Sequence, residues 1–196
     1  GVTLEDKTGI ARLLLENGAD VRELNCLRKH MSALKGGRLA EACHPARHLT
    51  LVLSDIVGSP AEDIGSGPTL GDSSSFAQCW EILRKYDLLD RIRPGLRRFF
   101  ENGRRGRLPD TPKPGDLLLG DARCRIVGDN RLMLQAARQA GDRLGFQTRL
   151  LCDDDRGEAG TAAVAYAEVI RRTLARRRPG QPPLLLIAGG ELTVTV

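Results

Sequence analysis

The stretch "RIVGDNRLMLQAARQAGDRLGFQTRLLC", residues 125–152, reads as a strand, a helix and a second strand in direct succession. Its apolar residues recur with the helical period until Gly145 ends the run, at Met133, Ala136, Ala137, Ala140 and Leu144. The pattern repeats at once: a helical stripe over 159–174 precedes the buried-type strand "PPLLLIAGG", residues 182–190. This alternation predicts an α/β fold with a mostly parallel, doubly wound, Rossmann-like sheet covered by helices on both faces.

The first half of the chain predicts further elements of the same kind. Thr3, with Asp6 three residues later, predicts the N-cap of a helix that Gly18 ends. A second helix is expected from about Val21. The remaining expected pieces are a strand at 48–55, helices at 76–86 and 90–100, and a Pro-rich connector at 110–116.

Composition indicates an ordinary globular protein. The 196 residues are 41% hydrophobic and 28% charged, enough for about one domain with a real core. No apolar run has the length of a membrane span, so we expect no membrane partner. The five cysteines include no C-x-x-C pair, which predicts reduced thiols and a cytoplasmic protein.

The net charge of +5 raises the question of nucleic-acid binding. Aromatic residues make up only 4% of the chain, so few side chains are available to stack on bases. The densest basic run, "RRTLARRRPG" at 171–180, closes a predicted helix, where cations favour the negative end of the helix dipole. We therefore expect solvated helix ends and no nucleic-acid partner.

Two polar loops are expected at the carboxyl ends of strands, where ligands bind in sheets of this kind. One is "SDIVGSPAEDIGSGPTLGD", residues 54–72, and the other is "AGGE", residues 188–191. Their glycines allow backbone N–H groups to approach an anion, although glycines also simply make turns. Neither loop has the P-loop pattern or the G-x-G-x-x-G spacing of dinucleotide sites.

A third feature is the segment "NCLRKHMSALKGG", residues 25–37. Its polar residues fall at helical offsets on a single cationic stripe, followed by two glycines: Asn25, Arg28, Lys29, Ser32 and Lys35. Such a stripe suits an anionic ligand. On periodicity alone, an exposed amphipathic helix explains it better.

Four segments occur in an order that resembles the glycerate 2-kinase family, members of which are sometimes named hydroxypyruvate reductase: "NCLRKHMSALKGGRLA", "LVLSDIVGSPAEDIGSGPT", "TPKPGD" and "GGELTVTV". The resemblance spans essentially the whole chain. It implies phosphorylation of D-glycerate to 2-phosphoglycerate, with ATP and Mg²⁺ as cofactors, D-glycerate as the small-molecule partner and an open oligomeric state.

Family members are considerably longer than this chain, so the resemblance implies a central fragment that is inactive alone. Residues 1–183 would be the α/β kinase domain without its N-terminal part, and 184–196 the start of the C-terminal MOFRL domain. Three positions depart from the family pattern: Ser59 replaces an aspartate, Gly65 an alanine, and Leu192 a small or polar residue.

The resemblance also assigns candidate roles. Asp55 is the expected catalytic carboxylate and Mg²⁺ ligand, with Lys35 as catalytic cation and Glu191 as second metal ligand. The expected substrate-binding residues are Asn25, Arg28, Ser54, Ser66 and Thr69, and the expected phosphate-binding glycines are Gly65, Gly67, Gly189 and Gly190. Asp63 is interpreted as a turn or cap residue and His30 as a packed or solvated histidine.

Two alternatives stay open. A hydroxypyruvate reductase using NAD(P)H would carry a dinucleotide fingerprint with an acidic residue about 20 positions later, and this sequence has none. A non-catalytic α/β fragment that only binds partners is the other alternative.

Overall fold

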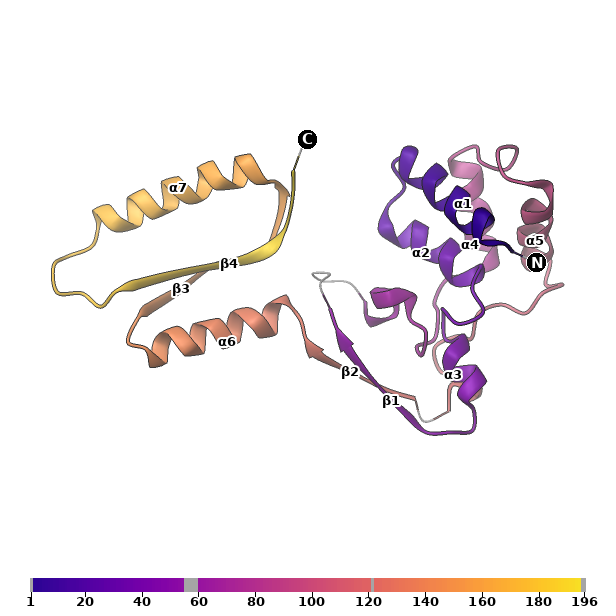
Figure 1. Cartoon of the computed structure of the whole chain (residues 1–196), viewed down its shortest axis with the longest axis horizontal. Helices are drawn as coiled ribbons and strands as arrows, with labels where there is room; N and C mark the ends of the chain where they lie inside the picture. The colour runs from indigo at the N-terminus through magenta and orange to yellow at the C-terminus, as the bar shows by residue number, and fades with distance from the viewer. Residues whose placement is uncertain (1, 55–59, 121, 195–196) are drawn as a thin grey trace. The chain divides into compact units, whose positions relative to one another are not determined.

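The computed structural model describes residues 2–54, 60–120 and 122–194. Helices, two short 3-10 helices (η) and strands follow one another along the chain (Figure 1). In order they are α1 (Leu4–Glu16), α2 (Val21–His30), α3 (Arg38–Cys43), β1 (His48–Leu53), η1 (Ala61–Ser66), α4 (Phe76–Lys85), α5 (Pro94–Arg104), η2 (Leu117–Leu119), β2 (Ala122–Gly128), α6 (Asn130–Arg143), β3 (Gln147–Glu158), α7 (Ala159–Ala175) and β4 (Leu184–Thr193).

The chain divides into two compact units. Unit 1 consists of Gly1–Leu51 and Pro60–Arg125, and unit 2 consists of Val52–Ser59 and Ile126–Val196. The division therefore falls within β1 and within β2, which pair as a two-stranded sheet and run in the same direction (Figure 1).

Unit 1 is built around a helical core. Its first helix begins as predicted, because the Thr3 hydroxyl accepts from the Asp6 N–H while the Asp6 carboxylate accepts from the Thr3 N–H. The buried apolar residues come from α1, α2, α4 and α5 and the turn after α4, and include Leu14, Leu27, Trp80, Leu83 and Phe100. Burial of these side chains supplies most of the favourable free energy of folding of unit 1.

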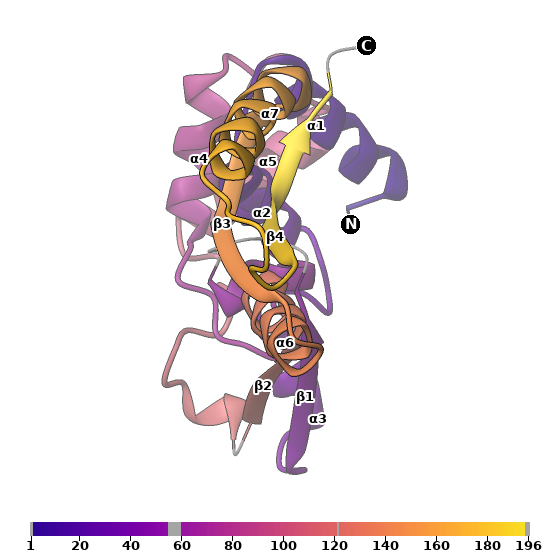
Figure 2. The same ribbon diagram turned by 90° about the vertical axis from the view of Figure 1, so that its left-hand side faces the viewer.

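Unit 2 has the predicted strand–helix–strand form. β3 and β4 are parallel neighbours joined through α7, and α6 and α7 lie on opposite sides of the pair (Figure 1). Figure 2 shows the same two strands side by side from the end of the unit. Close helix–strand packing explains Gly141 of α6, since a Cβ there would lie 2.6 Å from side-chain atoms of Thr148 and Leu185.

The predicted α/β class with parallel strands is confirmed, and the strands of the described residues lie in two sheets of two. Two local expectations need correction. β3 continues to Glu158, well beyond residue 152, and "AGGE" at 188–191 lies within β4. β4 pairs with β3 as far as Thr193, so these glycines belong to a strand and do not form a loop after it.

The apolar stripe predicted on α6 is also not buried. Met133 and Leu144 are exposed, whereas Leu134, one position along, is 4% exposed and lies against Gly189 of β4. No residue of α7 is buried, and Val164 is 74% exposed. Unit 2 therefore carries apolar helix surface that no described residue of the unit covers.

β1, in the other sheet, also carries exposed apolar side chains. Its alternate residues Leu49, Leu51 and Leu53 are all exposed, on one face of the strand. None of the helices in the described part of the chain has the length and apolar character needed to cross a membrane. A row of exposed leucines on a strand is a site for self-association in water.

We predict that the 196-residue chain binds the dye ANS and self-associates in gel filtration because of this surface. The double variant Leu49→Thr, Leu51→Thr should reduce both effects and leave the urea midpoint of unit 1 almost unchanged, measured by fluorescence of Trp80, the single tryptophan. Leu27→Thr, at a fully buried position, is the matched control and should cost about 3 kcal/mol or more. A monodisperse wild-type chain that does not bind ANS would contradict the prediction.

Candidate active site

Helix α2 places several polar side chains inside unit 1. The helix begins with a capping box between Asp20 and Glu23 and ends at His30. The Arg38 guanidinium donates to the Lys29 carbonyl in the last turn of the helix at 3.0 Å and to the Ser32 carbonyl just beyond it at 2.8 Å. The predicted stripe from Asn25 to Lys35 is therefore not a single helical face.

Lys29 is the most deeply placed charge on α2. Its side chain is 3% exposed, and its Nζ lies 3.2 Å from Oδ1 of Asp63 and 3.2 Å from Oδ1 of Asp72. Burial acts against the ammonium, but the charge of Asp72 and the hydrogen bonds to both carboxylates outweigh it and raise the pKa of Lys29. The prediction of an exposed amphipathic helix is wrong at this position, and Asp63 is an ion-pair partner besides being part of η1.

Asp72 is fully buried and has a complete set of partners. Besides Lys29, its Oδ1 accepts from the N–H and the hydroxyl of Ser74, and its Oδ2 accepts from the Thr111 hydroxyl at 3.0 Å. Burial raises the pKa of Asp72, but the Ser74 hydrogen bonds and Lys29 lower it overall. Asp72 thereby ties the Pro-rich connector, the end of the polar loop and α2 together.

Gly36 is required by this packing. It has a φ of +60°, and a Cβ at this residue would lie 3.0 Å from Thr111 and 3.1 Å from Lys29. A side chain would thus meet both a strained backbone conformation and a filled space. The first glycine of the "KGG" motif is explained by this close approach.

His30 is buried and packed, and not solvated, which were the two interpretations of the sequence. Its Nδ1 lies 2.8 Å from the Cys26 carbonyl and its Nε2 lies 2.7 Å from Oδ1 of Asp110. Both neighbours are acceptors, so both ring nitrogens carry protons in this geometry. Burial works against the charged ring, but the contacts with Cys26 and the charge of Asp110 raise the pKa of His30.

The segment 65–67 has a left-handed backbone throughout. Gly65, Ser66 and Gly67 have φ values of 59°, 61° and 53°, and such a value is uncommon for serine. The Ser66 hydroxyl donates to Oδ1 of Asn25 at 3.0 Å, and the N–H groups of Gly36 and Gly37 donate to the carbonyls of Ser66 and Gly67. Tertiary contacts thus hold a strained turn, a feature typical of functional sites.

Lys35 lies beside this turn, and no carboxylate is among the described groups that shift its pKa. Its Nζ donates to the Gly65 carbonyl at 2.9 Å. Burial lowers the pKa of Lys35, and the neighbouring charges of Arg28 and Lys7 lower it further. An anion bound here would relieve the repulsion among these three cations, so the corner favours a carboxylate or a phosphate.

The structure brings together five of the residues that the sequence predicted for the site: Asn25, Lys35, Gly65, Ser66 and Gly67. Arg28 adds charge to this group. We call the group, with Arg28, the anion corner. Thr69 is engaged elsewhere, because its hydroxyl lies 2.7 Å from that of Thr50 on β1.

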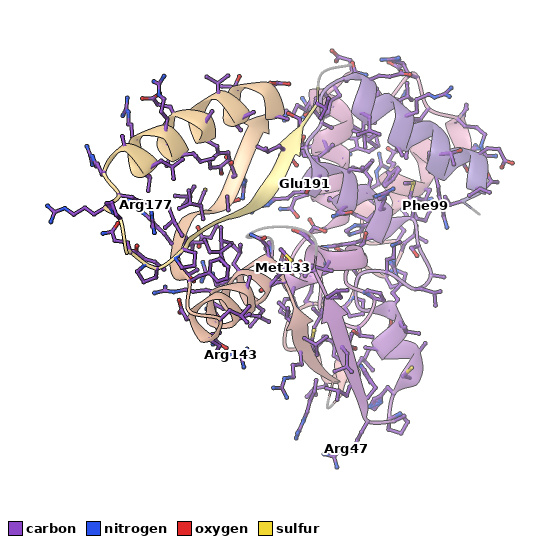
Figure 3. All side chains as sticks on the ribbon, turned by 60° about the vertical axis from the view of Figure 1, so that its left-hand side comes forward. Arg47, Phe99, Met133, Arg143, Arg177 and Glu191 are labelled. Carbon is purple, nitrogen blue, oxygen red and sulfur yellow. The ribbon has the colours of Figure 1, made fainter. Side chains whose placement is uncertain are left out.

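The other predicted residues lie outside unit 1. Ser54 belongs to unit 2 and its N–H donates to the Gly128 carbonyl at 2.8 Å. Gly189, Gly190 and Glu191 are on β4 of the same unit (Figure 3). Asp55 and Ser59 lie outside the described residues.

Close packing is a sufficient reason for the two β4 glycines. A Cβ at Gly189 would lie 2.5 Å from Oδ1 of Asn130, and one at Gly190 would lie 2.2 Å from the Asp155 carbonyl oxygen. Gly190 therefore needs glycine whether or not a phosphate binds there, whereas a side chain at Gly189 would have to displace the side-chain ends of Asn130 and Leu134. Their predicted role in binding nucleotide stays a prediction.

The described residues of unit 1 do not offer Mg²⁺ a set of free carboxylates. Oxygens of Asp63 and Asp72 are held by Lys29, and those of Asp72 also by Ser74 and Thr111. Glu191 is a single exposed carboxylate on β4. Mg²⁺ needs several oxygen ligands, which these described carboxylates do not supply together.

Sequence reasoning missed the ion-pair network around Lys29. Asp63, Asp72 and Thr111 lie 34 to 82 positions from Lys29, and helical periodicity carries no information over that distance. The available signals were weak: a lysine two positions after Leu27 on the predicted helix, and several carboxylates in the polar loop.

We predict that Lys29→Met strongly destabilises unit 1, because it leaves two carboxylates in the interior without their cation. The expected loss is about 3–5 kcal/mol in the urea unfolding of unit 1 followed by Trp80 fluorescence. Lys85→Met is the matched control: Lys85 pairs with Glu23 at the surface, and its loss should barely move the midpoint. Equal midpoints for the two variants would show that the Lys29 pairs contribute little.

Known proteins resemble this chain in sequence and in structure. The chain matches the family described as "Domain of unknown function (DUF4147)" over residues 1–101. It is 34% identical over its whole length to glycerate 2-kinase of Pyrococcus horikoshii and 32% identical to an Agrobacterium vitis protein named as a hydroxypyruvate reductase. The crystal structure of glycerate kinase from Thermotoga maritima superposes on the whole chain with a TM-score of 0.84 at 31% identity.

The chain spans less than half of these relatives: 44% of the P. horikoshii enzyme, 48% of the A. vitis protein and 44% of the T. maritima structure. The resemblance to glycerate kinases that the motifs predicted is confirmed along the entire chain. This chain belongs to the DUF4147 family and corresponds to part of the longer glycerate kinases.

Proposed function

We propose that the chain is the central part of a kinase that transfers a phosphoryl group from ATP to the 2-hydroxyl of D-glycerate. The observation that carries this proposal is the anion corner, in which a half-buried lysine contacts a left-handed turn held by Asn25 and an exposed arginine adds positive charge to that lysine. The similarity to glycerate kinases over the whole chain supports the same reaction.

The corner suits the demands of phosphoryl transfer, which needs positioning and charge neutralisation more than covalent chemistry. Lys35 and Arg28 would bind the glycerate carboxylate or a phosphoryl oxygen. Asn25 fixes the conformation of Ser66, so the turn is already in place before an anion arrives. Preorganised donors of this kind stabilise developing charge without reorganising during the reaction.

Several parts of the proposal rest on the sequence and the family resemblance. Asp55 and Glu191 are proposed as Mg²⁺ ligands, Asp55 also as the catalytic carboxylate, and Ser54 and Thr69 as further substrate contacts. Gly189 and Gly190 are proposed to approach the nucleotide. Residues 184–196 are proposed to begin a C-terminal MOFRL domain. A cytoplasmic location is proposed from the cysteines, all five of which are free.

We predict that the chain, extended by its natural flanks, consumes ATP in the presence of D-glycerate and Mg²⁺ and forms 2-phosphoglycerate, identified by NMR. The 196-residue chain alone should show no turnover. Formation of 3-phosphoglycerate would contradict the position of transfer. NADH-dependent turnover of hydroxypyruvate would favour the reductase instead.

We further predict that Lys35→Gln in the extended protein lowers kcat/KM for D-glycerate by about 100-fold or more, because it removes a charge-assisted contact to an anion. Its melting temperature should change little, since the ammonium makes one described hydrogen bond, to Gly65. Lys85→Gln, at a surface ion pair with Glu23, is the control and should keep full activity. Normal kinetics in Lys35→Gln would exclude Lys35 from the site.

A further inference from the structure

Two buried cysteines face each other in the core of unit 1. Cys26 on α2 is 6% exposed and Cys79 on α4 is fully buried. Their Sγ atoms lie 3.4 Å apart, and the Cys79 Sγ is also 3.6 Å from the Cys26 carbonyl oxygen. Neither the anion corner nor the Lys29 network uses these thiols.

The two thiols have different surroundings. The two thiols share a hydrogen bond in which either sulfur can be the donor, and the His30 ring lies close by, with Cys26 Sγ, Cys79 Sγ and a ring nitrogen all within 4.8 Å of one another. The hydrogen bond with Cys79, followed by the contact with His30, lowers the pKa of Cys26, whereas burial raises the pKa of Cys79. Cys26 is thus the nucleophilic member of the pair.

The His30 ring does not favour a metal centre at this place. Both of its nitrogens face acceptor oxygens, Cys26 carbonyl and Asp110 carboxylate, so each carries a proton and neither has a free lone pair. A positive ring beside a thiol stabilises a thiolate instead.

Of the two paired thiols, Cys26 is the one that a small molecule reaches first. It lines a surface pocket of about 710 Å³ together with Lys29, Asp63, Gln78 and Ile82. Cys79 is not among the residues that line this pocket. A reagent that enters the pocket therefore meets the low-pKa thiol, with the second thiol directly behind it.

We propose that Cys26 and Cys79 form a redox-active pair that a peroxide converts to a disulfide. The Cys26 thiolate attacks one peroxide oxygen, the O–O bond breaks, and Cys26 becomes a sulfenic acid as hydroxide leaves and takes up a proton to form water. The Cys79 sulfur then attacks the Cys26 sulfur, the S–OH bond breaks, and the Cys79 proton leaves with the hydroxide as a second water. Two thiols and one hydrogen peroxide thus give one disulfide and two waters.

The geometry requires only a small movement for this step. A disulfide bond is about 2.05 Å long, so the sulfur atoms must approach by about 1.4 Å from their present separation. The bond would join α2 to α4 across 53 positions of sequence. Closing a loop of this length restricts the unfolded chain, and the oxidised protein should melt several degrees higher.

We predict that mild treatment of the reduced 196-residue chain with hydrogen peroxide, followed by alkylation and trypsin, yields one dominant disulfide. It should join the peptides 23–28 and 48–84 and disappear after treatment with dithiothreitol. Alkylation of the untreated chain should modify Cys26 faster than the other four cysteines at pH 6. Neither measurement depends on glycerate kinase activity, so the proposal fails or succeeds independently of the proposed function.

Three controls distinguish a specific disulfide between Cys26 and Cys79 from random oxidation. Cys43→Ser should leave the 23–28 to 48–84 product unchanged, and Cys79→Ser should lower disulfide formation at Cys26 at least tenfold. Peroxide treatment in guanidinium should scatter the disulfides over all five cysteines. The proposal is overturned if Cys26 in the folded chain pairs with Cys43, Cys124 or Cys152 as often as with Cys79, or if it stays reduced while those thiols oxidise.

Discussion

The arrangement of unit 1 depends on one buried ammonium group. Lys29 holds Asp63 and Asp72 at 3.2 Å each, and those carboxylates belong to η1 and to the end of the polar loop. Asp72 also accepts hydrogen bonds from Thr111 in the Pro-rich connector and from Ser74 before α4. Because an uncompensated charge in the interior is very costly, these segments are held against α2 as a group.

The anion corner is built on the same helix, one turn earlier. Asn25 fixes Ser66 in a left-handed conformation, and Gly36 and Gly37 bind the same segment from the other side. Lys35 contacts this turn, and the like charge of Arg28 lowers its pKa. The buried Asn25 and Lys29 of α2 thus hold the polar loop in place, while Arg28 on the helix and Lys35 after it supply positive charge for an anion.

The two units differ in how well they are packed. In the described part of the chain, the fully buried apolar side chains belong almost entirely to unit 1, with Leu134 the contribution of unit 2. The strands and helices of unit 2 are well formed but keep apolar residues such as Val164 and Leu174 in contact with water. Unit 2 therefore has regular helices and strands, but few of its described side chains are buried.

The sequence by itself determined the elements, because caps, turn glycines and hydrophobic periodicity act over a few residues. Thr3, Gly18 and the strand–helix alternation after residue 125 were all interpreted correctly. It also predicted Asn25, Lys35 and Ser66 as site residues, through motifs that resemble a known family, and their role stays a prediction. Only the tertiary structure decided that Lys29 is buried between Asp63 and Asp72, that Met133 is exposed, and that Cys26 meets Cys79. These contacts join residues far apart in the chain, and their free energies come from burial and charge pairing, which local patterns do not encode.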